Sequence, residues 1–219
     1  MKMKRSPQEE RRVAILDAAA AVFFEQGYAA ASIDAVIERI GGSKRNIYTM
    51  FGSKERLFIA LVSENSDKMF GPLLAEGAVR KDLKDALTDF SGRFLNIIMS
   101  RRMVGVYRAV VSEASRLPEL AASFYRTGPD RGAEWVAGIL KEAHARGEIH
   151  VDDAKSAAQQ FIGILRGNLY MEIVLGLRKP LEPHEIDHAA ISAVDLFLNG
   201  VNARVCSGSC KLNGGDRPA

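Results

Sequence analysis

Apolar residues recur at helical spacing along nearly the whole chain, and almost no stretch alternates apolar and polar residues as a strand does. The pattern therefore predicts an all-α protein. The predicted helices cover about residues 7–26, 33–40, 44–51, 54–70, 81–100, 104–115, 129–146, 153–175 and 183–201. No internal repeat is found.

The starts of three short helices are marked by serine residues. Ser32, Ser43 and Ser53 each stand where a side-chain oxygen can accept hydrogen bonds from first-turn amides. Gly27 and Gly42 are placed to end or separate helices. These signals predict a compact bundle of short helices, followed by longer amphipathic helices that form a larger bundle.

This pattern divides the chain into three parts. Residues 1–57 are predicted to form an N-terminal three-helix domain, and residues 58–205 a larger helical-bundle domain. From Cys206 onward apolar residues vanish, and glycine, serine, asparagine and proline become frequent, so residues 206–219 are predicted to be a disordered tail. Cys206 and Cys210 lie in that tail and hold no core together, which agrees with a reducing compartment.

Positive charge is clustered rather than large in total, since the net charge is only +3. A first cluster lies within residues 2–12, and a second one lies within residues 44–56. Such clusters meet phosphate groups in some proteins and form a solvated face in others, and charge alone leaves both open. No apolar stretch approaches the roughly 20 residues of a membrane span, and the N-terminus is not a signal peptide, so a cytoplasmic protein without membrane contact is expected.

Two short helices joined by a glycine-containing turn have the layout of a helix-turn-helix. The second of them begins with Lys44, Arg45 and Asn46. Arginine can bond the O6 and N7 atoms of guanine, and asparagine the N6 and N7 atoms of adenine, so Arg45 and Asn46 are candidate base readers. Lys44 and Lys54 are candidates for phosphate contacts. An ordinary helical hairpin with solvated charges remains the alternative.

A longer set of residues resembles the DNA-binding domain of the TetR family. The matching stretches are Ile15-Leu16-Asp17-Ala18-Ala19, Phe23-Phe24, Gly27-Tyr28, Ser32-Ile33, Gly42-Ser43-Lys44, Ile47-Tyr48 and Phe51-Gly52-Ser53-Lys54-Glu55-Arg56-Leu57-Phe58. The resemblance implies a homodimer that binds double-stranded operator DNA, with repression as the commonest mode. It implies phosphate contacts for Ser32, Tyr48 and Lys54, although Tyr48 could instead pack in the core.

The full set of DNA-binding residues expected from motif and resemblance follows the starts of three helices. The set comprises Ser32, Ser43, Lys44, Arg45, Asn46, Tyr48, Thr49 and Lys54. Gly42 departs from the β-branched residue usual in the family, Arg45 from a small residue, and Thr49 and Met50 from an aromatic residue and a histidine. The operator sequence therefore cannot be carried over from relatives.

The C-terminal region is similar to the regulatory domain of AcrR- and AefR-like members of that family, over about residues 104–178. The resemblance implies a small-molecule effector pocket inside the bundle and a dimer made by the last two long helices. The candidate pocket residues are Phe94, Met103, Tyr107, Phe124, Trp135, Phe161, Arg166 and Tyr170. Plain core packing is the alternative for each. Arg166 needs Glu113, Glu172 or a ligand anion as its partner.

Two further patterns favour other classes of protein. His184-Glu185-Ile186-Asp187-His188 matches the His-Glu-x-x-His pattern of zinc peptidases, but it directly follows Pro183 and carries Asp187, which suits a solvated first helical turn. Cys206 and Cys210 could form a redox or metal clip, and a purely structural helical adaptor is the third alternative. No catalytic set is identified, so neither an enzyme nor a cofactor is expected.

Overall fold

A computed structural model describes residues 6–75 and 82–202. Every regular element within these residues is a helix, so the all-α prediction is confirmed. The elements are α1 (Pro7–Ala30), α2 (Ile33–Ile40), α3 (Lys44–Phe51), α4 (Lys54–Ala75), α5 (Leu83–Ile98), α6 (Arg101–Glu113), α7 (Pro118–Tyr125), the π-helical turn η1 (Arg126–Asp130), α8 (Arg131–Ala145), α9 (Ala154–Leu175) and α10 (Pro183–Asn202).

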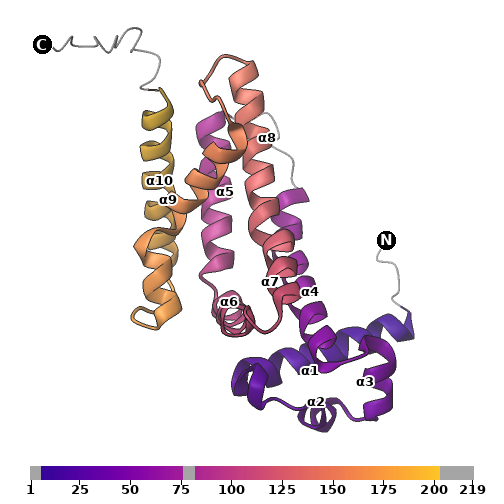
Figure 1. The fold of residues 1–219 in the computed structure, drawn as a ribbon. Coiled ribbons are helices and arrows are strands. Elements are labelled where there is room, and N and C mark those ends of the chain that lie inside the picture. The colour runs from indigo at the N-terminus through magenta and orange to yellow at the C-terminus, as the bar shows by residue number, and fades with distance from the viewer. Residues whose placement is uncertain (1–5, 76–81, 203–219) are drawn as a thin grey trace, which may run out of the picture.

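The helices form two groups along the molecule (Figure 1). Helices α1, α2 and α3 gather at one end, and α4 runs from them into a longer bundle of the remaining helices. Helix α6 lies across the junction and contacts α1, while α10 packs along α5 and α9 along α8. Because α4 is one continuous helix from Lys54, it passes through the boundary that the sequence places between residues 57 and 58.

Serine caps fix the starts of the short helices, as predicted. The Ser32 hydroxyl accepts from the amide of Ala35 at 3.1 Å, and the Ser43 hydroxyl accepts from the amide of Asn46 at 3.4 Å. The Ser53 hydroxyl accepts from the Arg56 amide at 3.2 Å. These caps satisfy first-turn amides that have no partner within the helix.

Helix α1 ends in a break rather than a clean stop. Gly27 has φ 76° and ψ 157°, outside the helical region, so regular helix ends at the glycine that the sequence predicts as its stop, and a last turn then reaches Ala30. The break directs the Tyr28 ring into the core, where it is 4% exposed and stacks on Phe58 with ring centroids 4.8 Å apart. Phe23 joins this aromatic cluster.

By length and composition, α1 alone among the described helices could cross a membrane. Its apolar window has a mean hydropathy of 1.3, and 44% of that window is buried inside the protein. The expectation that no stretch approaches the length of a span is therefore wrong for this helix. Its apolar face, with Ile15, Ala19 and Val22 fully buried, packs against α2, α4 and α6, which accounts for the composition.

The larger bundle differs from the sequence-based prediction in three places. The segment after the helix predicted to end at residue 115 forms α7 and then η1, neither of which the apolar pattern predicts. Helix α4 continues about five residues past its predicted end and contains Pro72. Helix α9 is broken at Gly167, with φ 47° and ψ −160°. Cys206, Cys210 and the rest of the predicted tail lie outside the described residues.

Candidate nucleic-acid interface

The predicted DNA-binding residues lie at the N-caps of α2 and α3, along α3, and at the start of α4. Seven of them are exposed, and Lys54 is half-buried; the exposed set is Ser32, Ser43, Lys44, Arg45, Asn46, Tyr48 and Thr49. Tyr48 is 46% exposed, so its core-packing alternative is wrong, whereas Phe51 is a core residue at 7% exposure. Seven of the eight positions are thus open to solvent.

The inner side of α3 explains why this surface is presented to solvent. Ile47 and Phe51 are spaced four residues apart and are both buried. They pack with Val36 of α2 in the same apolar core. Tyr48, Thr49 and the first turn of α3 are therefore exposed, while Met50 packs at the edge of the core.

The turn between α2 and α3 is held by a side chain from α1. Gly41 and Gly42 have φ of 67° and 113°, a region that L-amino acids with side chains rarely adopt. The Arg11 Nη2 atom donates a hydrogen bond to the Gly41 carbonyl at 2.6 Å. A Cβ atom on Gly42 would stand 2.3 Å from the same nitrogen. Arg11 therefore fixes the turn that aims α3.

Arg12, in the first basic cluster, also makes contacts within the protein. It forms an ion pair with Glu64 of α4, and its guanidinium lies 4.8 Å from the centre of the Phe51 ring. Arg11 and Arg12 therefore stabilise the packing of α1 on the rest of the domain. Residues 2–5 of that cluster lie outside the described residues.

The two cations at the start of α3 differ in whether they already have an ion-pair partner inside the protein. The Lys44 ammonium lies 2.8 Å from the Asp34 carboxylate, whose hydrogen bond and charge raise the pKa of Lys44. Within residues 6–75 and 82–202, Arg45 makes no ion pair. Arg45 is thus the cation that this turn offers to a ligand without breaking an internal contact.

The predicted effector residues other than Arg166 lie in or against one hydrophobic core, within which their rings form more than one group of aromatic contacts. Phe94, Phe161 and Met103 are almost completely buried. Trp135 stacks on Phe90, and Phe161 packs against Phe197. These contacts are what core packing predicts.

A second group brings three of the predicted effector residues together. Tyr107 lies 6.1 Å from Phe124 and 5.5 Å from Tyr170 between ring centroids, joining α6, α7 and α9. Burial raises the pKa of Tyr170 to about 12. The Arg166 guanidinium lies 5.7 Å from the centre of the Tyr170 ring.

Arg166 does not have the partner expected from the sequence. Glu113 pairs with Arg116, and Glu172 lies 3.9 Å from Arg178. The buried Nε atom of Arg166 has no hydrogen-bond partner. Internal pairing of Arg166 with Glu113 or Glu172 is therefore wrong, because the break at Gly167 places this side chain beside a groove between α9 and α10.

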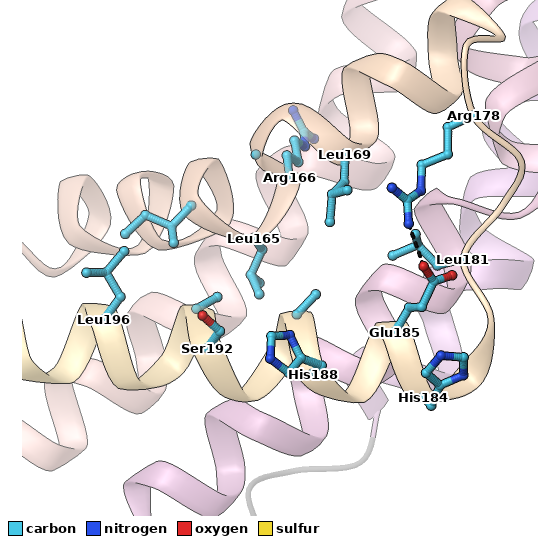
Figure 2. A pocket seen from close by; sticks show the side chains of 14 residues that line it. Leu165, Arg166, Leu169, Arg178, Leu181, His184, Glu185, His188, Ser192 and Leu196 are labelled. Atoms are coloured by element: carbon cyan, nitrogen blue, oxygen red, sulfur yellow. Dashed lines mark hydrogen bonds and ion pairs between the residues drawn. The ribbon is translucent and has the colours of Figure 1, made fainter.

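The groove between α9 and α10 has a volume of about 610 Å³ (Figure 2). Arg166, Arg178, His184 and His188 line it together with apolar residues. Figure 2 shows Glu185 directed toward Arg178, with which it forms an ion pair. Glu185 also accepts from the amide of Glu182 at 2.9 Å, as a residue in a first helical turn does.

The His-Glu-x-x-His match is therefore a solvated helix start. Both histidines are exposed, and Glu185 is committed to Arg178 and to the backbone. Across the part of the chain that the structure describes, no group of three or more histidine, cysteine and acidic residues could hold a metal ion.

Two features around the predicted DNA-binding residues could not be predicted from the sequence. Asp34, beside Lys44, gave no signal, because a single acidic residue in a first helical turn is ordinary. Tyr28 belongs to the family-like pattern, but only the fold brings its ring beneath Lys54, at 4.5 Å from the ammonium to the ring centre.

A capped helix-turn-helix with an exposed arginine and asparagine at the start of its second helix defines a DNA-binding transcription regulator. The model of bacterial regulatory proteins of the tetR family matches residues 15–61. The model of the AefR-like transcriptional repressor C-terminal domain matches residues 85–200, more than half of the chain. The chain therefore belongs to the TetR family, and it is a transcription regulator rather than an enzyme.

Individual relatives support this assignment. The structure of the flavonoid-responsive regulator FrrA is 33% identical, covers 90% of this chain and 99% of its own, and has a TM-score of 0.74. The HTH-type transcriptional repressor AcnR of Corynebacterium jeikeium is 33% identical over 166 residues, which are 73% of this chain and 80% of AcnR. A TetR-family regulator from Mesorhizobium loti, 22% identical, covers 90% of this chain and 98% of its own with a TM-score of 0.79, and shows the fold.

A shorter match is confined to part of its relative. The HTH-type transcriptional activator FasR of Mycolicibacterium smegmatis is 40% identical over 65 residues, which are 30% of each chain. Relatives thus include both repressors and an activator.

Proposed function

We propose that this regulator binds an inverted-repeat operator as a homodimer, represses transcription in the cytoplasm, and is released by a small apolar or aromatic effector. We assign DNA binding to residues 1–57 and dimerisation and effector binding to residues 58–205. The observation that carries the proposal is the first turn of α3, where Arg45 and Asn46 are exposed and Arg45 has no internal ion pair among the described residues. Repression is supported by the AefR-like repressor model and by AcnR.

Dimerisation through α9 and α10 is supported by apolar residues that these helices leave exposed. They are Ile164, Met171, Leu175, Ile191 and Leu196. Monomeric proteins rarely expose large apolar patches. The groove of about 610 Å³ between the two helices is a concave surface on which a second copy of the chain can pack. A twofold dimer reads two half-sites in inverted orientation.

The test is footprinting of the purified protein on promoter DNA, beginning with the region upstream of its own gene. We expect protection of a short inverted repeat, with two protein chains per repeat in sedimentation analysis. Affinity is expected to fall steeply with salt, because cationic side chains release counterions from phosphates. A complex that is insensitive to salt, or one chain on an unrepeated site, would contradict the proposal.

An aromatic effector is supported by two observations. Tyr107, Phe124 and Tyr170 form an aromatic group in the regulatory bundle with the Arg166 guanidinium beside it. FrrA, 33% identical, is a flavonoid-responsive regulator. We therefore propose that a flavonoid-like aromatic compound, bound beside Tyr107, Tyr170 and Arg166, favours the arrangement that does not bind DNA.

The effector proposal predicts reciprocal binding energies. A flavonoid panel is screened for release of the protein from operator DNA, and a releasing compound is titrated calorimetrically with and without operator. Operator is expected to weaken effector binding by the same factor by which effector weakens operator binding, on the usual scale of about 1–3 kcal/mol. Equal affinities in the two titrations would show that the compound does not act through this switch.

A further inference from the structure

Lys54, for which the family resemblance implies a phosphate contact, lies against the buried ring of Tyr28. The Lys54 ammonium lies 4.5 Å from the centre of the Tyr28 ring, within the range of a cation–π interaction. Tyr28 is 4% exposed and stacks on Phe58, one turn beyond Lys54 in α4. The ring is therefore held by the core, and it limits where the Lys54 side chain can lie.

A second cation, from the regulatory part of the chain, shares the same ring. The Arg116 guanidinium lies 5.9 Å from the Tyr28 ring centre. Arg116 belongs to the turn between α6 and α7, where its Nη1 atom lies 3.3 Å from the carboxylate of buried Glu113. The Glu113 pair thus ties this cation to the end of α6.

The charges around the ring act on Lys54. Burial lowers the pKa of Lys54 most strongly, the Glu55 carboxylate raises it, and Arg116 lowers it. Burial and the Glu55 carboxylate raise the pKa of the Tyr28 hydroxyl to about 12, so the ring stays uncharged beneath the ammonium near neutral pH. An uncharged ring attracts both cations through its negative face, while the cations repel each other.

We propose that Tyr28 is a positioning residue for operator binding, which holds Lys54 where it meets a phosphate, and that Arg116 sets the position of Lys54 through the ring they share. The proposal rests on the proposed phosphate contact of Lys54. Under this proposal, the turn between α6 and α7 acts electrostatically on Lys54 without any contact that passes through the interior of the bundle.

The first test compares operator affinity in variants of the full chain. Tyr28→Phe keeps the ring and is expected to keep affinity, whereas Tyr28→Leu is expected to lower it about three- to tenfold. In a Lys54→Ala background, Tyr28→Leu is expected to cause no further loss, because its target is gone. An equal loss in both backgrounds would overturn the proposal. If Lys54→Ala alone has no effect, the phosphate contact fails, which is a separate result.

The second test needs no DNA. The lysines are converted to carbon-13 dimethyl-lysine, and the Lys54 NMR signal is identified by its absence in Lys54→Arg. We expect an upfield ring-current shift that persists in Tyr28→Phe. In Arg116→Gln, we expect a higher Lys54 pKa and a larger upfield ring-current shift, because the competing cation is removed.

The matched control for this experiment is Arg146→Gln. Arg146, like Arg116, is an exposed arginine beside the end of a helix and is paired with a nearby glutamate, but it lies at the end of α8, away from Tyr28. It is expected to leave the Lys54 signal unchanged. A Lys54 signal unaffected by Arg116→Gln would overturn the role of Arg116. Because this substitution leaves buried Glu113 without its cation, the fold of the variant is checked by circular dichroism before its Lys54 signal is compared.

Discussion

Replacing Arg45 with alanine is expected to lower operator affinity by about 1–3 kcal/mol for each half-site and to relax preference at one base pair. The reason is that Arg45 is exposed in the first turn of α3 and makes no ion pair among the described residues, so its guanidinium can present two parallel donors to a guanine edge. Affinity is measured on the operator and on variants of it changed one base pair at a time.

Lys54→Ala is the control for this experiment. A phosphate contact carries no sequence information, so this variant is expected to weaken binding to all sequences alike. It is also expected to reduce the salt slope by about one for each phosphate that the lysine no longer neutralises. If Arg45→Ala also weakens every sequence uniformly, Arg45 contacts phosphate and the base-reading assignment is wrong.

Gly42→Val is expected to destabilise the protein by about 1–3 kcal/mol and to weaken operator binding. Gly42 has φ 113°, where a β-branched residue is strained. In addition, any Cβ would stand 2.3 Å from the Arg11 Nη2 atom. Arg11 can move aside only by giving up its hydrogen bond to the Gly41 carbonyl, so the turn that aims α3 loses its tether.

Thermal unfolding followed by circular dichroism measures this effect, with a decrease of about 2–4 °C expected for each kcal/mol in a chain of this length. The matched control is Gly138→Ala. Gly138 lies on the exposed face of α8 with open space around it, so alanine is expected to stabilise that helix slightly. An unchanged melting temperature in Gly42→Val would contradict the strain argument.

Local capping chemistry made the N-terminal helices predictable. Ser32, Ser43 and Ser53 each cap the helix that follows, because a hydroxyl at that position has few better partners than first-turn amides. The exposed positions of α3 followed from the same boundaries, since Ile47 and Phe51 had to face the core.

Features that depend on distant contacts were not predictable. The apolar pattern predicts no helix at Pro118 and a helix that begins at Pro129, yet Pro118 starts α7 and Pro129 lies inside η1, where the missing amide hydrogen is tolerated. Gly167 gave no sign of a break, because the apolar stripe continues on both sides of it. The partner expected for Arg166 was wrong for the same reason.

The continuous course of α4 would turn a small movement into a large one under the proposed switch. Its 22 residues span about 33 Å at 1.5 Å per residue, so the helix would act as a lever between the larger bundle and the N-terminal helices. A tilt of about 5° around its far end would move Lys54 by about 3 Å. In a twofold pair the two displacements add to about 6 Å, against a separation of about 34 Å between successive major grooves. A rotation of only about 5° would therefore move the two recognition helices out of register with successive major grooves.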